Sequence, residues 1–212
     1  MSVDWFAAPA LRTPRLRLDA LRLTDAPDLL AALGPPAQRA EVLAHLRLPP
    51  LVDLAGARRV VAAALTDRDR VAYAQRLTDG TFVGTTSFYE IAPAVRAVAI
   101  GHTWVARPWW RTFVNTESKL AMLTRAFEGL GAERVVWHTD VRNERSQEAI
   151  RRLGAQHEGL LRHHRIRTDG SLARHRAARD ARRRVARRAR PLARPLGGVA
   201  RMSRMQISRA AR

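Results

Sequence analysis

The chain has 212 residues, of which 46% are apolar, and this is enough material for the core of one ordinary domain. It contains no cysteine, which excludes disulfide frameworks, cysteine-based zinc sites and thiol catalysis. The longest apolar run, residues 60–65, is too short to span a bilayer, and the start of the chain lacks the basic and apolar segments of a signal peptide. We therefore expect a cytoplasmic protein with no membrane partner.

The formal net charge of +19 is distributed unevenly along the chain. Residues 1–171 hold 24 basic and 18 acidic residues, whereas residues 172–212 hold 14 arginines and one acid, Asp180. Lysine occurs once, at Lys119. A strongly basic chain is typical of nucleic-acid binding, but most of the excess here belongs to the C-terminal tail.

The first half of the chain predicts a strand, then helices, then a hairpin. Alternating leucines over residues 11–23 indicate the strand, and the segment 24–33 has the start signals and apolar spacing of a helix. Residues 38–66 predict two further helical pieces, broken at Pro49-Pro50. Asp79-Gly80 is a strong hairpin signal. The strands on either side of that turn cover residues 71–77 and 81–91, and another antiparallel strand covers residues 94–105.

The second half predicts strands that alternate with helices. A loop over residues 107–113 leads to a helix with Asn115 as its N-cap and Glu117 in its first turn. A short buried strand follows at residues 135–139, and Asn143 caps the next helix, which ends at Gly154. The last predicted strand and turn are residues 156–166 and Asp169-Gly170. This order indicates an α+β fold, with one mixed and mostly antiparallel sheet flanked by helices.

The junction over residues 105–115 is the first candidate site. A strand there runs into a helix start, whose unpaired N–H groups and positive dipole end bind phosphates, and Arg107 and Arg111 add positive charge. An ordinary strand–helix connection with exposed arginines has the same pattern, and the spacing alone favours that simpler interpretation.

The second candidate site is the segment 139–146. Asn143 and Ser146 stand at the cap and at the third helical position, which places Ser146 beside the end of the preceding strand. On local evidence a plain capping motif is the better interpretation.

Several linked motifs resemble the GNAT superfamily of N-acetyltransferases, most closely the branch of ribosomal-protein alanine N-acetyltransferases (RimJ/RimL-type). The motifs are LRTPRLRL at 11–18, VNTESKL at 114–120, AFE at 126–128, TDVRNERSQEAIRRLGA at 139–155 and EGLLRHH at 158–164. The resemblance implies a single GNAT domain over residues 11–172 and acetyl-CoA as co-substrate, with no metal. It also implies an amine acceptor, which is either the N-terminal amine of a protein, such as a ribosomal protein, or a small amine. We expect a monomer or a homodimer.

The resemblance places acetyl-CoA between two central strands, with its pyrophosphate on the loop before the long helix. The family pattern there is Gln/Arg-x-x-Gly-x-Gly/Ala, whereas this chain has no glycine in the segment 110–115. The residues that the resemblance assigns to the co-substrate are Val105, Arg107, Arg111, Thr112, Val114, Asn115, Thr116, Asn143 and Ser146.

For catalysis, the resemblance gives Ser146 the role of protonating the leaving thiolate. The candidate base of the branch, a glutamate, corresponds to Arg165 here, so that role does not transfer. The remaining base candidates are Glu90, His102 and His138, although such residues more often have structural roles in strands. The aromatic residues that would border the acceptor pocket are Trp104, Trp109 and Trp110.

Residues 173–212 depart from the family, which continues after the Asp-Gly turn into a last strand that opens Arg-Asp-x-Val. A permitted codon choice for residues 173–177, read one base later, encodes Arg-Asp-Thr-Val, which suggests a frameshift. We expect the last strand to be missing, with a disordered or partly helical tail and a weakened enzyme. The alternatives are an inert tail extension, or a non-catalytic basic protein that binds RNA or ribosomes through this tail.

Overall fold

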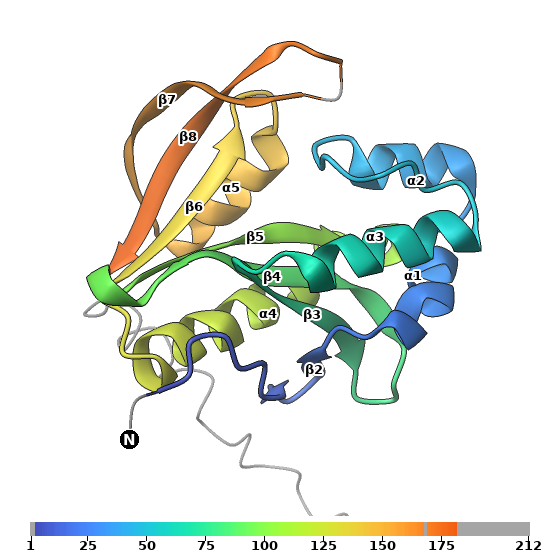
Figure 1. Ribbon diagram of the computed structural model, residues 1–212, viewed down its shortest axis with the longest axis horizontal. Helices are drawn as coiled ribbons and strands as arrows, with labels where there is room; N and C mark the ends of the chain where they lie inside the picture. Colours follow the sequence, from blue (N-terminus) through green and yellow to red (C-terminus); the bar gives the residue numbers. More distant parts are fainter. Residues whose placement is uncertain (1–2, 168, 182–212) are drawn as a thin grey trace, which may run out of the picture.

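The computed structural model describes residues 3–167 and 169–181, which form one eight-stranded sheet with helices on both faces (Figure 1). The strand order is β1-β2-β3-β4-β5-β6-β8-β7, and among these described strands the β5–β6 pair alone is parallel. The strands are β1 Leu11–Arg12, β2 Leu16–Ala20, β3 Arg70–Leu77, β4 Phe82–Ala92, β5 Ala97–Val105, β6 Arg134–Asp140, β7 Gln156–Ile166 and β8 Leu172–Ala181. The helices are α1 Ala26–Leu33, α2 Pro36–Leu43, α3 Leu54–Thr66, α4 Phe113–Thr124 and α5 Glu144–Leu153. None of these helices is long and apolar enough to cross a membrane.

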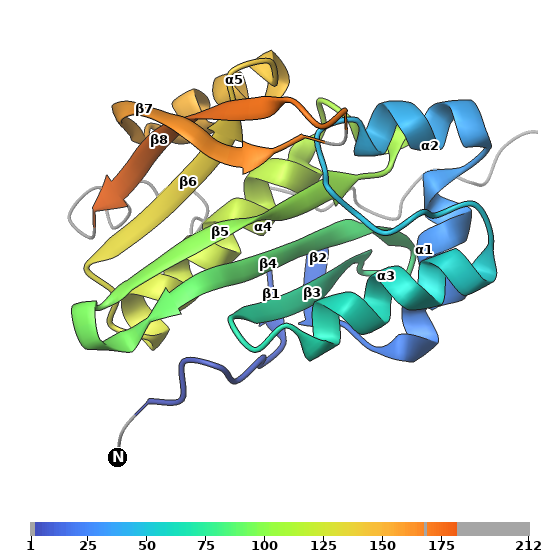
Figure 2. The same ribbon diagram turned by 45° about the horizontal axis from the view of Figure 1, so that its top comes forward.

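The sheet is covered by different helices on its two faces (Figures 1 and 2). On one face, α4 and α5 contribute Met122 and Leu153 to an apolar cluster that also contains Tyr73 of β3 and Phe88 of β4. On the other face, α1 and α3 pack on small strand residues, Ala72 among them. Burying one apolar stripe of each helix on a sheet face is the main source of stability in such a layered domain.

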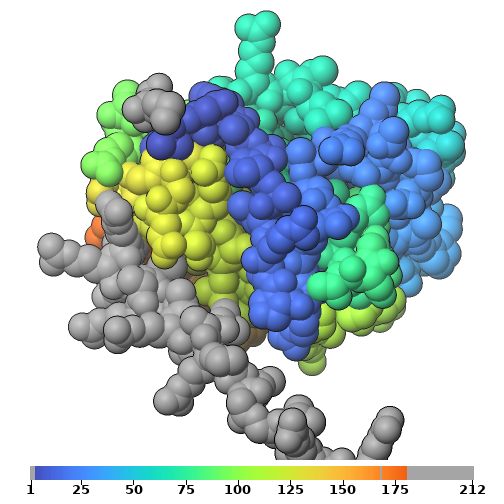
Figure 3. Space-filling model, turned by 90° about the horizontal axis from the view of Figure 1, so that it is seen from below, coloured from blue at the N-terminus to red at the C-terminus, as the bar shows by residue number. Residues whose placement is uncertain are grey.

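The N-terminal segment is fastened to α4 through a buried carboxylate. Glu117 is 4% exposed. Its carboxylate accepts a hydrogen bond from the Thr13 hydroxyl at 2.6 Å and forms an ion pair with Arg15 at 2.6 Å. Figure 3 shows the N-terminal segment (blue) lying beside α4 (yellow-green). Glu117 therefore connects the start of the chain to the central helix. Because α4 begins at Phe113, Glu117 lies beyond the first turn, in which the sequence pattern predicts it.

Most of the predicted elements are confirmed, because their signals are local. The Asp79-Gly80 turn joins β3 to β4, and Gly80 has the positive φ of +94° that such a turn requires. The Asn143 side chain accepts a hydrogen bond from the Ser146 N–H at 3.0 Å and caps α5, and Gly154 ends that helix with φ +79°.

Two boundaries differ from the prediction. The long helix begins at Phe113, and its N-cap is Thr112, whose hydroxyl accepts from the Val114 N–H at 3.4 Å. Asn115 is therefore not the N-cap but a residue of the first turn. The predicted first strand is divided into β1 and β2 by a turn in which the Thr13 hydroxyl accepts from the Leu16 N–H at 2.9 Å.

The prediction that the last strand is missing is wrong. Residues 172–181 form β8, which lies between β6 and β7 and pairs with both, so β7 does not lose its hairpin partner. On β8 the alanines Ala173, Ala177 and Ala178 are buried, and Asp180 accepts a hydrogen bond from the Trp137 indole at 3.0 Å. Small residues can fill this position because both neighbouring strands satisfy the backbone, which overrides the low strand propensity of alanine. The frameshift stays a hypothesis about the gene, and residues 182–212 lie outside the described residues.

Candidate active site

The sheet opens in its middle, between β5 and β6. The two strands pair in parallel only where Ala97–Ala99 faces Arg134–Val136. Beyond this stretch the two strands continue, to Val105 and to Asp140, without pairing with each other, and Figure 2 shows them diverging. The divergence leaves a wedge-shaped opening, lined by backbone and side chains of both strands.

A bulge in β5 borders this opening. Thr85 pairs with Trp104 and Ser87 with Gly101, so that His102 and Thr103 together oppose the single residue Thr86. His102 has a φ of +49°, which is a strained conformation for a residue other than glycine. A bulge of this kind takes backbone groups out of the ladder, and here it does so beside the cavity.

The opening holds a cavity of about 260 Å³. Its walls come from β5, from β6, from the first turns of α4 and α5, and from the segment after α2. Twelve of the residues singled out from the sequence line it: His102, Trp104, Val105, Trp109, Trp110, Arg111, Thr112, Asn115, Thr116, His138, Asn143 and Ser146. The fold thus brings the two candidate segments, 105–115 and 139–146, to opposite sides of one cavity.

Three other predicted residues lie outside the cavity lining. The exposed carboxylate of Glu90 forms an ion pair with Arg165 at 2.9 Å. Arg107 pairs with Glu41 at 3.2 Å. Val114, in the first turn of α4, is completely buried in the core between that helix and the sheet.

The connection between β5 and α4 contains no glycine, and one of its arginines adopts the left-handed backbone conformation that glycine usually adopts. Arg111 has a φ of +60°, which costs an L-residue roughly 1–2 kcal/mol. The loop is held by Trp110, whose indole N–H donates to the Val105 carbonyl at 2.7 Å. The first turn of α4 still presents backbone N–H groups that have no partner within the helix, so the connection retains the features of an anion site.

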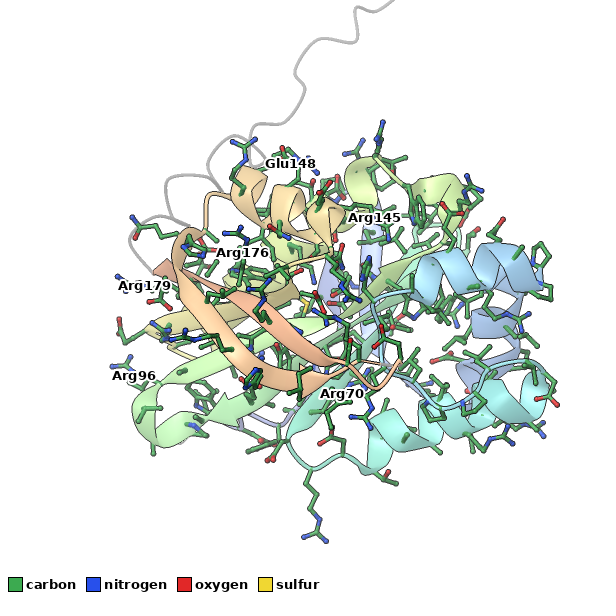
Figure 4. All side chains as sticks on the ribbon, turned by 90° about the horizontal axis from the view of Figure 1, so that it is seen from above. Arg70, Arg96, Arg145, Glu148, Arg176 and Arg179 are labelled. Atoms are coloured by element: carbon green, nitrogen blue, oxygen red, sulfur yellow. The ribbon has the colours of Figure 1, made fainter. Side chains whose placement is uncertain are left out.

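A second arginine reaches this connection from across the cavity. The guanidinium of Arg145 lies 3.8 Å from the centroid of the Trp110 ring, and Figure 4 shows Arg145 on α5. Both helix starts and both arginines, Arg111 and Arg145, border the same cavity. Their combined positive potential suits a phosphate-bearing ligand.

Two histidines in the cavity wall are neutral at pH 7. Burial, together with Arg70 and Arg165, lowers the pKa of His102 to about 4. Burial also lowers the pKa of His138, whose Nδ1 lies 3.1 Å from the Tyr89 hydroxyl and 3.5 Å from the Glu90 carboxylate. Glu90 favours the protonated form of His138 from 3.5 Å, and it is the largest influence that opposes burial there, whereas Asp67 is the weakest of the influences on His102.

Within residues 3–167 and 169–181, the side chains of Glu90, His138 and His164 place three possible metal-ligand atoms within 4.8 Å of one another. The Glu90 carboxylate is already paired with Arg165, and the guanidinium competes with any cation for it. That no metal takes part in the reaction remains a prediction.

The comparison with known proteins decides the family. The model of the acetyltransferase (GNAT) domain matches residues 15–156, which is most of the chain. The chain belongs to the GNAT acetyltransferase family. It is therefore a transferase of the N-acetyltransferase class. Among curated proteins, none matches the sequence.

Solved structures of GNAT proteins share this fold. A protein from T. thermophilus assigned as an acetyltransferase is 29% identical, with a TM-score of 0.79 and coverage of 89% of this chain and 97% of its own. Mycobacterium smegmatis RimJ, in complex with CoA-disulfide, is 19% identical, with a TM-score of 0.74 and coverage of 90% and 97%. The Microcin C7 self-immunity acetyltransferase MccE, in complex with acetyl-CoA and AMP, is 16% identical, with a TM-score of 0.70 and coverage of 80% and 93%. At 19% and 16% identity, the similarities to RimJ and MccE show a shared fold and nothing more.

Sequence reasoning missed Lys119 as a site residue of this GNAT domain. Lys119 is 6% exposed, lines the cavity, and donates hydrogen bonds to Thr103 at 2.5 Å and to Thr86 at 3.0 Å. Its place in the helix motif at 114–120 gave no sign of burial, because lysine on a helix is usually exposed. His45 and His175 also line the cavity and had no sequence signal.

Proposed function

We propose that this GNAT protein is an acetyl-CoA-dependent enzyme that acetylates a primary amine, and that it belongs to the RimJ/RimL-type branch. The observation that carries the proposal is the cavity between β5 and β6, which is lined by two helix starts and by three arginines, Arg111, Arg145 and Arg152. Such a combination suits an elongated thioester that ends in a diphosphate. The motifs at 114–120 and 139–155 support the choice of branch.

The residues around the cavity fit acetyl-CoA in three parts. The first turn of α4, with Thr112, Asn115 and Thr116, would hold the pyrophosphate through backbone N–H groups and through the positive end of the helix dipole. Val105 would lie along the arm of the co-substrate, and Asn143 beside it from the other wall. Arg107 and Val114 would contribute through the shape and charge of the loop and not through direct lining.

The reacting groups would lie beside the bulge in β5. Backbone N–H groups of the bulge at His102 and Thr103 would stabilise the oxyanion that forms when an amine attacks the thioester. Ser146, on the opposite wall, would give a proton to the departing thiolate. The proton lost by the amine would pass to His138, with Glu90 stabilising the imidazolium, because His138 lines the cavity and Glu90 lies 3.5 Å from its Nδ1.

Part of the cavity wall is aromatic, from the β5–α4 connection to Trp104 on β5. Trp104, Trp109 and Trp110 line it, as does His45 from the segment after α2. The part of this wall next to Trp104, away from the connection that would hold the pyrophosphate, would accept the first side chain of a peptide or the carbon chain of a small amine. A peptide N-terminus of a ribosomal protein is the acceptor that the branch favours.

An acceptor screen that records release of the CoA thiol tests the proposal. We expect saturable release with one class of amine, and peptides that carry a free N-terminus should be tested beside polyamines and amino acids. The variants Ser146→Ala and His138→Gln should lower kcat by roughly 10²–10⁴ without a matching change in acetyl-CoA affinity. The variant His163→Gln, on an exposed residue of β7, is the matched control. No release with any amine, together with no binding of acetyl-CoA, would contradict the proposal.

The alternative function, RNA or ribosome binding through the tail, has less support. It rests on residues 173–212, of which 173–181 form β8 of the domain and 182–212 lie outside the described residues. RNA binding that weakens steeply with salt and is retained in Ser146→Ala would support it.

A further inference from the structure

The chain contains a single lysine, and the fold buries it in the cavity of an acetyltransferase. Lys119 lies on α4 and is 6% exposed. Its side-chain nitrogen, Nζ, lies 2.5 Å from the Thr103 hydroxyl of the β5 bulge and 5.6 Å from the centroid of the Trp137 ring on β6. The nitrogen is therefore located between the two strands that diverge.

The surroundings of Nζ match a neutral amine. A neutral amine has two N–H donors and one lone pair, and the two hydroxyl oxygens of Thr86 and Thr103 accept one hydrogen bond each. The Thr103 hydroxyl can itself donate to the Gly101 carbonyl at 3.1 Å, and the Thr86 hydroxyl to the Met122 sulfur at 3.2 Å, so both oxygens are left to accept from the lysine. A third proton on Nζ would lack a hydrogen-bond acceptor among these groups. Burial accordingly lowers the pKa of Lys119 to about 7.

A neutral buried amine with its lone pair unused is a nucleophile. The cavity that it lines is the one that the proposed function assigns to the thioester of acetyl-CoA. Thr103, which binds the lysine, is part of the bulge in β5, and the N–H groups of that bulge would stabilise an oxyanion on the thioester. The amine of Lys119, the N–H groups that stabilise the oxyanion and the thioester of acetyl-CoA would therefore all lie in one cavity, and no external amine would be needed.

We infer that Lys119 is an acetylation site of the protein itself, with acetyl-CoA bound in its own cavity as the donor. In this reaction the C–N bond to Nζ forms and the C–S bond of the thioester breaks. The proton that the amine loses goes to the thiolate, so the products are Nε-acetyl-Lys119 and CoA. The inference rests on the proposed function, since it requires acetyl-CoA in the cavity between β5 and β6.

Acetylation would limit further activity of the site. The product amide has one N–H donor where the amine had two, so one of the two threonines loses its hydrogen bond. The added acetyl group would also occupy part of a cavity of about 260 Å³. The modified protein should bind acetyl-CoA more weakly than the unmodified protein.

Mass spectrometry of the full-length protein, incubated with acetyl-CoA alone, tests the inference. We expect one acetyl group on the peptide that contains Lys119, at a rate that saturates with acetyl-CoA concentration. The rate should rise to a plateau near pH 8, because the amine is then neutral. The matched control is Arg68→Lys, which adds an exposed lysine between α3 and β3. That lysine should react at least roughly tenfold more slowly, since it lacks the advantage of a donor held in place, and its rate should keep rising toward pH 10.

Calorimetry with acetyl-CoA on the same samples separates the two proposals. Binding without any acetylation of Lys119 would overturn this inference and leave the proposed function intact. An acetyl group found only at the chain N-terminus, or equal rates for Lys119 and the lysine of Arg68→Lys, would also overturn it. Failure to bind acetyl-CoA at all would overturn the proposed function.

Discussion

The two sides of the opening differ in how they are held together. The side formed by β1–β5 has a core of large apolar residues, and Tyr73 and Phe88 meet edge to face at 6.2 Å with almost no exposure. The side formed by β6, β8 and β7 buries mainly alanines and Trp137, and β7 is exposed or half-buried along its whole length. The comparison indicates that the first side supplies most of the stability, while the second supplies a polar wall for chemistry and depends on strand pairing.

The largest effect should come from removing β8. A chain that ends at Ser171 loses the strand that pairs with both β6 and β7, and it also loses the buried Asp180 that accepts from Trp137. We expect its melting temperature to fall by more than about 10 °C relative to a chain that ends at Ala181, because the loss amounts to several kcal/mol. Differential scanning calorimetry of the two truncated chains measures this difference. Equal melting temperatures would show that β8 does not support the second side.

A pair of large-to-small substitutions compares the two sides directly. Phe88→Ala should lower the free energy of unfolding by about 3–5 kcal/mol, because the side chain is 2% exposed in a packed core. Ile166→Ala, on β7, should change it by no more than about 0.5 kcal/mol, since Ile166 is 48% exposed. Urea denaturation of both variants provides the test, and similar losses would contradict the proposed division of stability.

Lys119, which lies at the opening between β5 and β6, should make the free energy of unfolding depend on pH. The pKa of Lys119 falls from 10.5 in the unfolded chain to about 7 in the folded protein, so between these values the unfolded state binds more protons. The free energy of unfolding should therefore rise with pH from about 7 to 10, by at most about 1.4 kcal/mol per unit. Lys119→Met should lack this rise. Urea denaturation at pH 7, 8 and 9 compares the two proteins, and parallel pH profiles would mean that Lys119 is not buried in its neutral form.

The features that could be predicted from the sequence are those encoded by neighbouring residues. The Asp79-Gly80 turn and the Asn143 and Gly154 helix ends each require only a few adjacent residues, and each is found where expected. β8 could not be predicted, because its alanines and arginines favour a strand only when β6 and β7 lie on both sides. The surroundings of Lys119 could not be predicted either, because the threonines that receive its hydrogen bonds are 16 and 33 residues away.

The smallest effect concerns the start of α5. Asn143→Ala removes the side-chain oxygen that accepts from the Ser146 N–H, and it should cost about 1 kcal/mol of stability. Asn143→Asp keeps an acceptor at the cap and should recover most of this loss. Thermal denaturation of the three proteins measures the cap. If Asn143→Asp is as unstable as Asn143→Ala, the cap is not the source of the effect.

Acetyl-CoA binding in the opening between β5 and β6 underlies both the proposed function and the acetylation of Lys119. Ala149 lines this cavity from α5, whereas Ala40 is exposed on α2, so phenylalanine at position 149 should fill the site and phenylalanine at position 40 should not. Isothermal titration with acetyl-CoA should give clear binding to the wild-type protein and to Ala40→Phe, and binding at least roughly tenfold weaker to Ala149→Phe, a loss of about 1.4 kcal/mol. Equal affinity of all three proteins, with Ala149→Phe folded by circular dichroism, would place the co-substrate elsewhere and contradict the account.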